Sequence, residues 1–350
     1  MRLFKTFYIF TQGSLKNSKN YYPKGLTMVG IVKLFLEKKI LVKVIAIDSV
    51  HPILYDQLRS FGCTVDECSH LKGEELLKIL PQYEGFIIRS KFKITKEIIT
   101  VCPHLKFIAR SGSGMENIDL EFAKSKGIEC FNSPEGNRDA VAEHLLGMVL
   151  MLINKLKIAD AEVRNGIWKR AENRGIELKG KTFALIGYGQ MGSAVAQRLQ
   201  GFDIKVLAYD KYKGNHEYRA SMEEIFEHAD FVSLHLPLTA ETTNIANAEW
   251  FNSFKKNIFF INTARGKCVK TAHLVSALKS GKVRGACLDV LEYESVSFEN
   301  INAEELPQDF HYLIHSDKVV LSPHIAGWTH ESYEKLSTFL AEKIKKKFFS

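Results

Sequence analysis

Short apolar runs alternate with amphipathic stretches along the chain from residue 42 onward. In the first half, unbroken apolar runs predict buried strands at 42–48, 85–90, 105–111 and 128–133. Segments with helical spacing, such as "PILYDQLRSFG" and "GEELLKIL", lie between them. Strands that are apolar on both faces and alternate with helices are typical of a parallel sheet covered on both sides.

A long helix is predicted next, at 139–166, and its first half is apolar nearly all round, which predicts burial between domains or subunits. A second alternating series follows. It predicts strands at 181–189, 205–210, 230–237, 257–264, 285–291 and 319–325, followed by a C-terminal helix. Six strands are the number of a complete dinucleotide-binding sheet. The pattern therefore predicts an α/β protein with two parallel sheets.

Charge and composition narrow the function classes. The net charge of the 350 residues is +8, but residues 1–41 carry eight basic residues against Glu37 alone, so the rest is close to neutral. We therefore expect no nucleic-acid partner. No apolar run is long enough to cross a membrane. Residues 1–41 are predicted to be a disordered extension, and no cleavage site of a secretory signal follows the first apolar stretch.

The cysteines and histidines are scattered. The six cysteines form no CxxC pair and no cluster with histidine, which favours a reducing cytoplasm over a disulfide framework. We expect no metal site.

A phosphate-binding loop is predicted between the first strand and the first helix of the second series. Gly187, Gly189 and Gly192 have the G-x-G-x-x-G spacing there, with Gln190 and Met191 in the first helical turn. Amide groups of such a turn face a bound pyrophosphate. Asp210 ends the next strand, about 20 residues further on, where a carboxylate accepts the adenosine ribose hydroxyls and favours NAD over NADP. An ordinary glycine turn is the alternative interpretation.

Polar residues end three of the later strands. Arg265, Glu294 and His324 all fall at the carboxyl edge of the second sheet, where ligands of open parallel sheets bind. A histidine can take the hydroxyl proton of a secondary alcohol, a nearby carboxylate stabilises the imidazolium, and an arginine can hold a substrate carboxylate. Each residue taken singly also has a structural interpretation, as a surface ion pair, a solvated acid or a core histidine.

Several motifs together resemble the D-2-hydroxyacid dehydrogenase family, most closely its short D-3-phosphoglycerate dehydrogenases. They are "RSGSGMENID" (110–119), "VAEHLLGMVL" (141–150), "GIWKR" (166–170), "LIGYGQMG" (185–192), "HLPLTAET" (235–242), "NTARG" (262–266), "LDVLEYE" (288–294) and "SPHIAGW" (322–328). The resemblance implies two doubly wound domains: a flavodoxin-like substrate domain at 42–137 and 323–350, and a Rossmann NAD-binding domain at 138–322 inserted into it.

The resemblance also implies roles for individual residues. Arg265, Glu294 and His324 would be the catalytic set. The cofactor would contact the glycine loop and Asp210, His235, Pro237, Thr263, Ala264, Asp289 and His324. The substrate would contact Arg89, Ser90, Ser111, Gly112, Ser113, Gly114, Asn137 and Arg265, with Arg89 and Ser90 reaching a distal phosphate. Relatives are usually dimers through the nucleotide-binding domain, and the apolar helix near 141–154 suits that interface.

Two departures bear on specificity. Glu294 is followed by Ser295 and a long segment where relatives continue into proline, and bulky Trp328 stands where many relatives have a small residue. The predicted activity is NAD-dependent oxidation of a D-2-hydroxy acid, with 3-phosphoglycerate, and so serine biosynthesis, as first choice. The alternatives are a reductase of glyoxylate, hydroxypyruvate or another 2-keto acid, and a non-catalytic protein that senses NAD.

Overall fold

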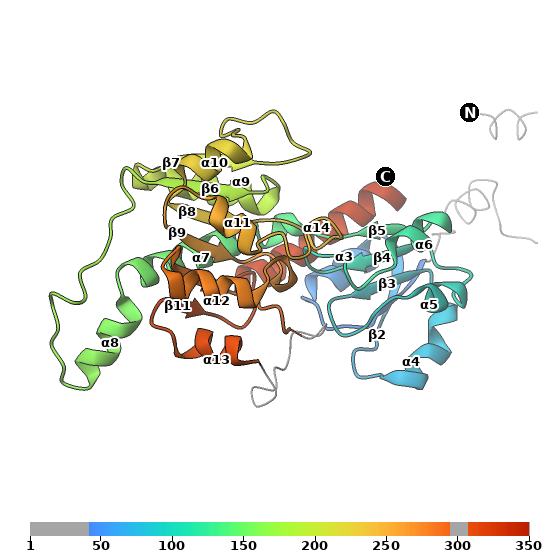
Figure 1. Ribbon diagram of the computed structural model, residues 1–350. Helices are drawn as coiled ribbons and strands as arrows, with labels where there is room; N and C mark the ends of the chain where they lie inside the picture. The colour runs from blue at the N-terminus through green and yellow to red at the C-terminus, as the bar shows by residue number, and fades with distance from the viewer. Residues whose placement is uncertain (1–41, 295–306, 350) are drawn as a thin grey trace, which may run out of the picture. The chain divides into compact units, whose positions relative to one another are not determined.

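The computed structural model describes residues 42–294 and 307–349 (Figure 1). The extension predicted at 1–41 and residues 295–306, the first half of the segment after Glu294, lie outside the described residues. Within the described ranges, no helix is both long and apolar enough to cross a bilayer.

The strands are β1 (Val42–Ala46), β2 (Cys63–Glu67), β3 (Gly85–Ile88), β4 (Phe107–Arg110), β5 (Glu129–Phe131), β6 (Thr182–Ile186), β7 (Lys205–Tyr209), β8 (Phe231–Leu234), β9 (Ile258–Asn262), β10 (Val283–Leu288) and β11 (Val319–Leu321). The α-helices are α3 (Ile53–Ser60), α4 (Gly73–Ile79), α5 (Lys96–Thr100), α6 (Leu120–Ser125), α7 (Arg138–Ile153), α8 (Leu156–Arg164), α9 (Gln190–Leu199), α10 (Met222–His228), α11 (Ala248–Ser253), α12 (Thr271–Ser280), α13 (Gln308–His315) and α14 (His330–Phe348). Short 3-10 helices are η1 (Leu80–Gln82), η2 (Pro134–Gly136), η3 (Gln200–Phe202) and η4 (Gly266–Cys268).

The first sheet has five parallel strands in the order β2-β1-β3-β4-β5. This is the flavodoxin-like order, with the change of direction between β1 and β3. The sequence pattern predicted four of these strands and missed β2. In β2 the buried residues Cys63 and Val65 alternate with partly exposed ones, because an edge strand lacks the continuous apolar run of a central strand.

The second sheet has six parallel strands in the order β11-β10-β9-β8-β6-β7. Arg219 makes one further parallel bridge to Ala208, outside β7. With this bridge counted, the order is that of the dinucleotide-binding fold, extended by β11 at one edge. The six strands predicted from the second apolar series are confirmed, and the change of direction lies between β6 and β8.

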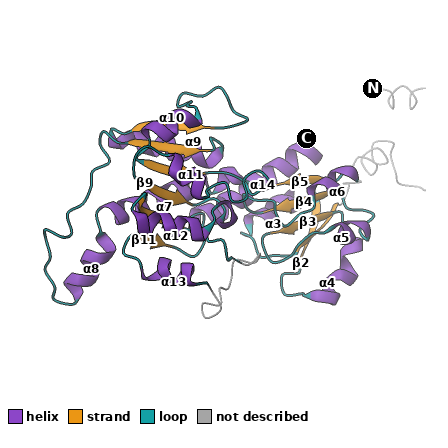
Figure 2. Ribbon diagram, in the orientation of Figure 1, coloured by secondary structure: helices purple, strands orange, loops and turns teal. Residues whose placement is uncertain are grey.

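Helices cover both faces of each sheet, as the alternation of strands (orange) and helices (purple) in Figure 2 shows. On the second sheet, α7 and α9 pack on one face, and α10 to α13 pack on the other. On the first sheet, α4, α5 and α6 cover one face and α3 and α14 cover the other. The prediction of two doubly wound α/β units is confirmed. We call them the first and second lobe.

The helix predicted at 139–166 is two helices. α7 ends at Ile153, Lys155 adopts a left-handed backbone with φ of +52°, and α8 begins at Leu156. Ala142, Leu145, Met148, Val149 and Ile153 of α7 pack inside the second lobe, against α9 and the sheet, whereas Met151 is 39% exposed. No residue of α8 is buried.

The chain passes between the lobes twice. It leaves the first lobe after η2 and returns after β11, and α14 then packs against α3, β5 and η2. The two passages lie together, since a Cβ added at Gly327 would come within 2.5 Å of Nδ2 of Asn137. We keep 42–137 with 323–350, and 138–322, as the proposed domain limits.

Candidate active site

His324 and Glu294 form a direct pair. Nδ1 of His324 lies 2.8 Å from Oε2 of Glu294, and both side chains are mostly buried. The other carboxylate oxygen of Glu294 accepts a hydrogen bond of 2.6 Å from the amide of Leu291. These contacts fix the carboxylate between the end of β10 and the turn that follows β11. The sequence predicted the two residues for one site, and the structure brings them into contact.

Asp289 holds the turn that carries His324. One carboxylate oxygen accepts from the amide of Ile325 and the hydroxyl of Ser322, and the other accepts from the amide of Ala326. The carbonyl of Asp289 accepts from the amide of His324 at 2.7 Å. These bonds support His324 in a left-handed backbone conformation (φ +56°) that non-glycine residues adopt uncommonly.

The same turn is tied to α7. Nε2 of His144 lies 2.9 Å from the hydroxyl of Ser322 and 3.6 Å from Oδ1 of Asp289. The buried Asp289 is therefore satisfied by groups of this chain. Its predicted contact with a nicotinamide carboxamide stays a prediction.

Arg265 pairs with a residue of the first lobe. Its Nε donates to Oε1 of Glu116 at 2.7 Å, and its Nη1 donates to the carbonyl of Ala264. Burial raises the pKa of Glu116, but the attraction of Arg265 and its hydrogen bond outweigh that effect, so the pKa lies below its ordinary value. The guanidinium thus sits at the carboxyl edge of the second sheet and faces the loop after β4.

That loop, residues 111–114, is held by side chains around it. Nη1 of the partly buried Arg110 donates to the carbonyl of Gly114 at 2.7 Å. The hydroxyl of Ser113 donates to Oδ1 of Asn137 at 2.6 Å, which ties the loop to the predicted hinge asparagine. Side chains at Gly112 and Gly114 would collide with Arg110 and Arg265 respectively. The hydroxyl of Ser111 is buried and has no partner among the described residues.

Burial lowers the pKa of Arg110 to about 10, a shift that nearby Glu116 opposes. Arg110 is still a cation at neutral pH.

Arg89 and Ser90 follow β3, beside this loop, and both are partly buried. The amide of Arg89 donates to Asp48, at the end of the neighbouring β1. Its guanidinium lies over the ring of Trp328, 4.6 Å from the centroid. Lys91 donates instead to the carbonyls of Ser69 and Leu71.

The glycine loop joins β6 to α9. Gly187 has a φ of +100°, and a side chain there would collide with the carbonyl of His235. A side chain at Gly192 would collide with the carbonyl of Gly187. Gly189 faces open space, with nothing within 4 Å of an added Cβ. Two glycines are thus required by close backbone packing, and the third leaves room for a ligand.

The first turn of α9 contains the other predicted loop residues. The side chain of Gln190 accepts from Arg138 at 2.8 Å, its carbonyl accepts from Ser193, and the partly buried Met191 follows it.

Asp210 lies at the end of β7, beside the loop. Its carboxylate accepts from the amides of Tyr188, Tyr212 and Lys213, at 2.8 to 2.9 Å. Burial raises the pKa of Asp210, but these hydrogen bonds outweigh it and lower the pKa overall. Lys211, which could have attracted a second phosphate, is paired with Glu241 at 2.9 Å.

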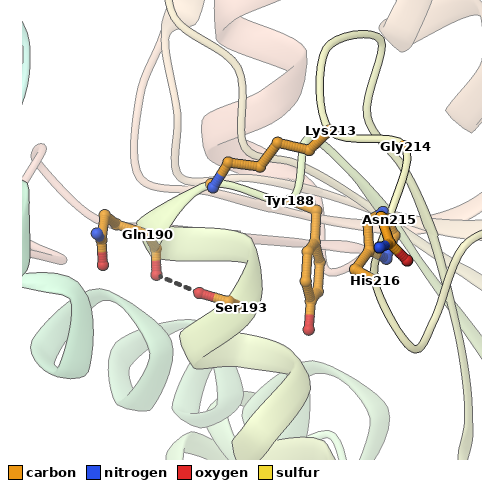
Figure 3. Close-up of a pocket in the computed structure, with 8 residues that line it drawn as sticks. Tyr188, Gln190, Ser193, Lys213, Gly214, Asn215 and His216 are labelled. Carbon is orange, nitrogen blue, oxygen red and sulfur yellow. Dashed lines mark hydrogen bonds between the residues drawn. The ribbon is translucent and has the colours of Figure 1, made fainter.

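A cavity of about 420 Å³ opens between the loop and the segment after β7 (Figure 3). Tyr188, Gly189, Gln190 and Ser193 line one side, and residues 213–216 line the other. The ring of His216 stacks on that of Tyr188, with 4.1 Å between centroids. A helix start that can accept an anion, the carboxylate of Asp210 and an adjoining cavity fit a dinucleotide.

Two further predicted cofactor contacts have unmet hydrogen-bonding groups. Nε2 of His235 and the hydroxyl of Thr263 are buried and have no partner among the described residues. Burial lowers the pKa of His235 to about 4, so its ring is neutral at pH 7. Pro237 and Ala264, the other two, use their carbonyls in bonds to Thr242 and Arg265. Buried groups without a partner fit the edge of a ligand site.

Sequence reasoning missed three residues that support this cluster: Glu116, Arg110 and His144. Glu116 and Arg110 fall inside the motif at 110–119 and His144 inside the motif at 141–150, so their segments were noticed. Their partners were not predictable, because Glu116 contacts a residue 149 positions later.

Comparisons with known proteins agree with this geometry. Residues 146–326 match the family described as "D-isomer specific 2-hydroxyacid dehydrogenase, NAD binding domain". Hydroxypyruvate reductase of Thermotoga maritima is 37% identical over 280 residues, which are 79% of this chain and 89% of that protein. D-3-phosphoglycerate dehydrogenase of Archaeoglobus fulgidus is 34% identical over 308 residues, which are 86% of this chain.

The chain spans only 56% of the length of the Archaeoglobus protein. Among solved structures, D-lactate dehydrogenase from Aquifex aeolicus, complexed with NAD and lactic acid, superposes with a TM-score of 0.74 at 29% identity. The match covers 87% of this chain and 94% of that one. The predicted NAD-binding domain is confirmed. The chain belongs to the D-isomer specific 2-hydroxyacid dehydrogenase family.

Proposed function

We propose that this chain interconverts a D-2-hydroxy acid and its 2-keto acid with NAD, and that 3-phosphoglycerate is its substrate. The observation that carries the proposal is the pair of His324 and Glu294, 2.8 Å apart on a turn that Asp289 holds. A histidine paired with a buried carboxylate at the carboxyl edge of an NAD-binding sheet is suited to move the proton of a secondary alcohol.

The residues divide the chemistry among them. Because Nδ1 of His324 faces Glu294, Nε2 takes the hydroxyl proton in oxidation and returns it in reduction. Glu294 stabilises the imidazolium that forms. Arg265 and the amides of residues 111–114 hold the substrate carboxylate and polarise the C2 oxygen. NAD, when bound, accepts the hydride from C2 or supplies it.

Arg89 favours a phosphorylated substrate. It follows β3, at the point where the first sheet changes direction, and ligands of open α/β sheets bind at such points. Replacing Arg89 with alanine should raise the KM for 3-phosphoglycerate far more than the KM for glyoxylate. Such an enzyme would catalyse a first step toward serine.

A second candidate function is the reduction of hydroxypyruvate or glyoxylate. The similarity to the hydroxypyruvate reductase of Thermotoga maritima favours it, because that match covers most of both chains. Both candidates use the same catalytic pair and differ in what contacts the far end of the substrate.

The test is a substrate panel with NADH and NADPH, followed at the nicotinamide absorbance, for the parent protein and His324→Ala. Loss of a general base should lower kcat by about 100-fold or more, while NADH binding, followed by fluorescence, is unchanged. Undiminished turnover in His324→Ala would contradict the proposal. Turnover of glyoxylate without turnover of the phosphate ester would favour the second candidate.

We also propose a homodimer in the cytoplasm. α8 and the residues after it expose the apolar side chains of Leu156, Val163, Ile167 and Trp168, and Met151 of α7 is exposed as well. Several exposed apolar side chains within one short segment suit a protein contact, and a second copy is the partner usual for the family. The six cysteines are free thiols, which fits a reducing compartment. Val163→Glu should halve the mass measured by light scattering.

A further inference from the structure

Trp328 makes a contact that neither the sequence nor the comparisons assign. Its side chain is 69% exposed, and the guanidinium of Arg89 lies 4.6 Å from the ring centroid. The ring of Tyr333 lies 5.7 Å from the same guanidinium. A large exposed indole costs free energy in water, so its stacking on a cation at the edge of the candidate site calls for a functional reason.

The backbone of Arg89 is fixed on both sides. Its amide donates to Asp48, and its carbonyl accepts from Nε of Arg110 at 3.0 Å and from the side chain of Asn117 at 3.2 Å. Because β1 and β3 are neighbours where the first sheet changes direction, the side chain of Arg89 starts from a ligand-binding position of the fold.

The guanidinium itself makes no hydrogen bond or ion pair with any residue in the described ranges; its contacts are the two aromatic rings. An arginine fork has five donors and suits the two oxygens of a phosphate or carboxylate. The rings contact the guanidinium without accepting its hydrogen bonds, so its N–H donors remain available to an anion.

Trp328 belongs to the same turn as the catalytic histidine. Its amide donates to the carbonyl of Ile325 at 2.8 Å, and the amides of Ile325 and Ala326 donate to Asp289. The turn therefore contacts Glu294 through His324 and contacts Arg89 through Trp328. The same turn thus positions both His324, the acid–base residue, and Trp328, which contacts the guanidinium of Arg89.

We infer that Trp328 is a positioning residue that holds the Arg89 guanidinium in place for an anionic group at the end of the substrate distant from the reacting carbon. The inference rests on the proposed function and names the residue that gives the site its preference for a distal anion. Trp328 would act through Arg89 and not on the reacting atoms.

The experiment compares two substrates that differ only in the distal anion, 3-phosphoglycerate and D-glycerate. In Trp328→Ala the KM for 3-phosphoglycerate should rise roughly 3- to 30-fold, the range expected for loss of a cation–π contact. The kcat for both substrates and the KM for D-glycerate should stay unchanged. Trp328→Phe, which keeps an aromatic face, should restore most of the lost affinity.

A double-mutant cycle supplies the control. If Trp328 acts through Arg89, the Trp328→Ala change should have no further effect on the KM for 3-phosphoglycerate in the Arg89→Ala background. An equal rise in KM for both substrates, a fall in kcat, or an undiminished effect without Arg89 would overturn the inference. Failure of the proposed function is distinguishable, because it would appear as absent turnover of every acid by the parent protein.

Discussion

Gly114→Ala tests whether the loop after β4 sets the position of Arg265. An added Cβ would lie against Nη2 of Arg265 and Oε2 of Glu116, closer than real Cβ atoms approach other heavy atoms. The φ of Gly114 is outside the left-handed region, so the alanine backbone fits without strain. Both colliding atoms end flexible side chains, so the ion pair should yield and the loop should stay.

The expected magnitude follows from this displacement. Arg265 would have to move by about an ångström, a shift that can cost an enzyme about 100-fold in rate. We therefore expect kcat/KM to fall about 100-fold, equivalent to about 2.7 kcal/mol of transition-state stabilisation. The free energy of unfolding should change by no more than about 1 kcal/mol, because no core contact is lost.

Steady-state kinetics and urea unfolding measure the two quantities on the same protein. Gly201→Ala is the matched control, since a Cβ there meets nothing within 4 Å, and its kinetics should equal those of the parent. If Gly114→Ala kept kcat/KM within about threefold of the parent, Arg265 would not depend on this loop. A large loss of stability without an activity defect in the folded fraction would show that the added methyl group displaces the loop and not the ion pair of Arg265 with Glu116.

Three further predictions concern the neighbouring charges. Glu294→Gln should lower kcat/KM about 10- to 100-fold, because the charged hydrogen bond to His324 is lost. NADH affinity, measured by fluorescence titration, should stay unchanged. An unaltered kcat/KM would show that Glu294 takes no part in the mechanism. Asp210→Ala should weaken NADH binding about tenfold in the same titration and raise the preference for NADPH, whereas equal weakening of both would contradict a ribose contact. Because the folded-state pKa of Glu116 lies below its ordinary 4.5, its stabilising effect is complete above that pH and is lost as the pH falls through the lowered pKa. The gap in unfolding free energy between the parent and Glu116→Gln should thus be constant at neutral pH and shrink below pH 4.5 in urea titrations, and a gap that widens there would refute this.

The fold was predictable where apolar runs are continuous. Central strands buried on both faces, such as β6 and β9, give an unmistakable pattern. β2 alternates buried and exposed residues at a sheet edge, and the neighbour of β7 is reduced to a single bridge at Arg219, so neither has a continuous apolar run. The break between α7 and α8 at Lys155 was not predictable either, because no glycine or proline marks it in the sequence.

The site was predictable where topology alone brings residues together. Glu294 and His324 follow neighbouring strands β10 and β11, so their pairing followed from the parallel sheet. The ion pair of Arg265 with Glu116 joins the two lobes, and the contact of Arg89 with Trp328 joins distant segments of the first lobe. Such contacts depend on how segments far apart in the sequence pack, and no local sequence pattern predicts which side chains will meet.

The return of α14 to the first lobe has a consequence for synthesis on the ribosome. Leu340, Ala341 and Ile344 are fully buried against Leu54, Leu58 and Phe107, so the core of the earliest strands lacks one wall until the last helix emerges. The second lobe has its own core by then and can fold as a unit. The part of the chain made first is therefore completed last, and during translation its sheet exposes an apolar face that chaperones can bind.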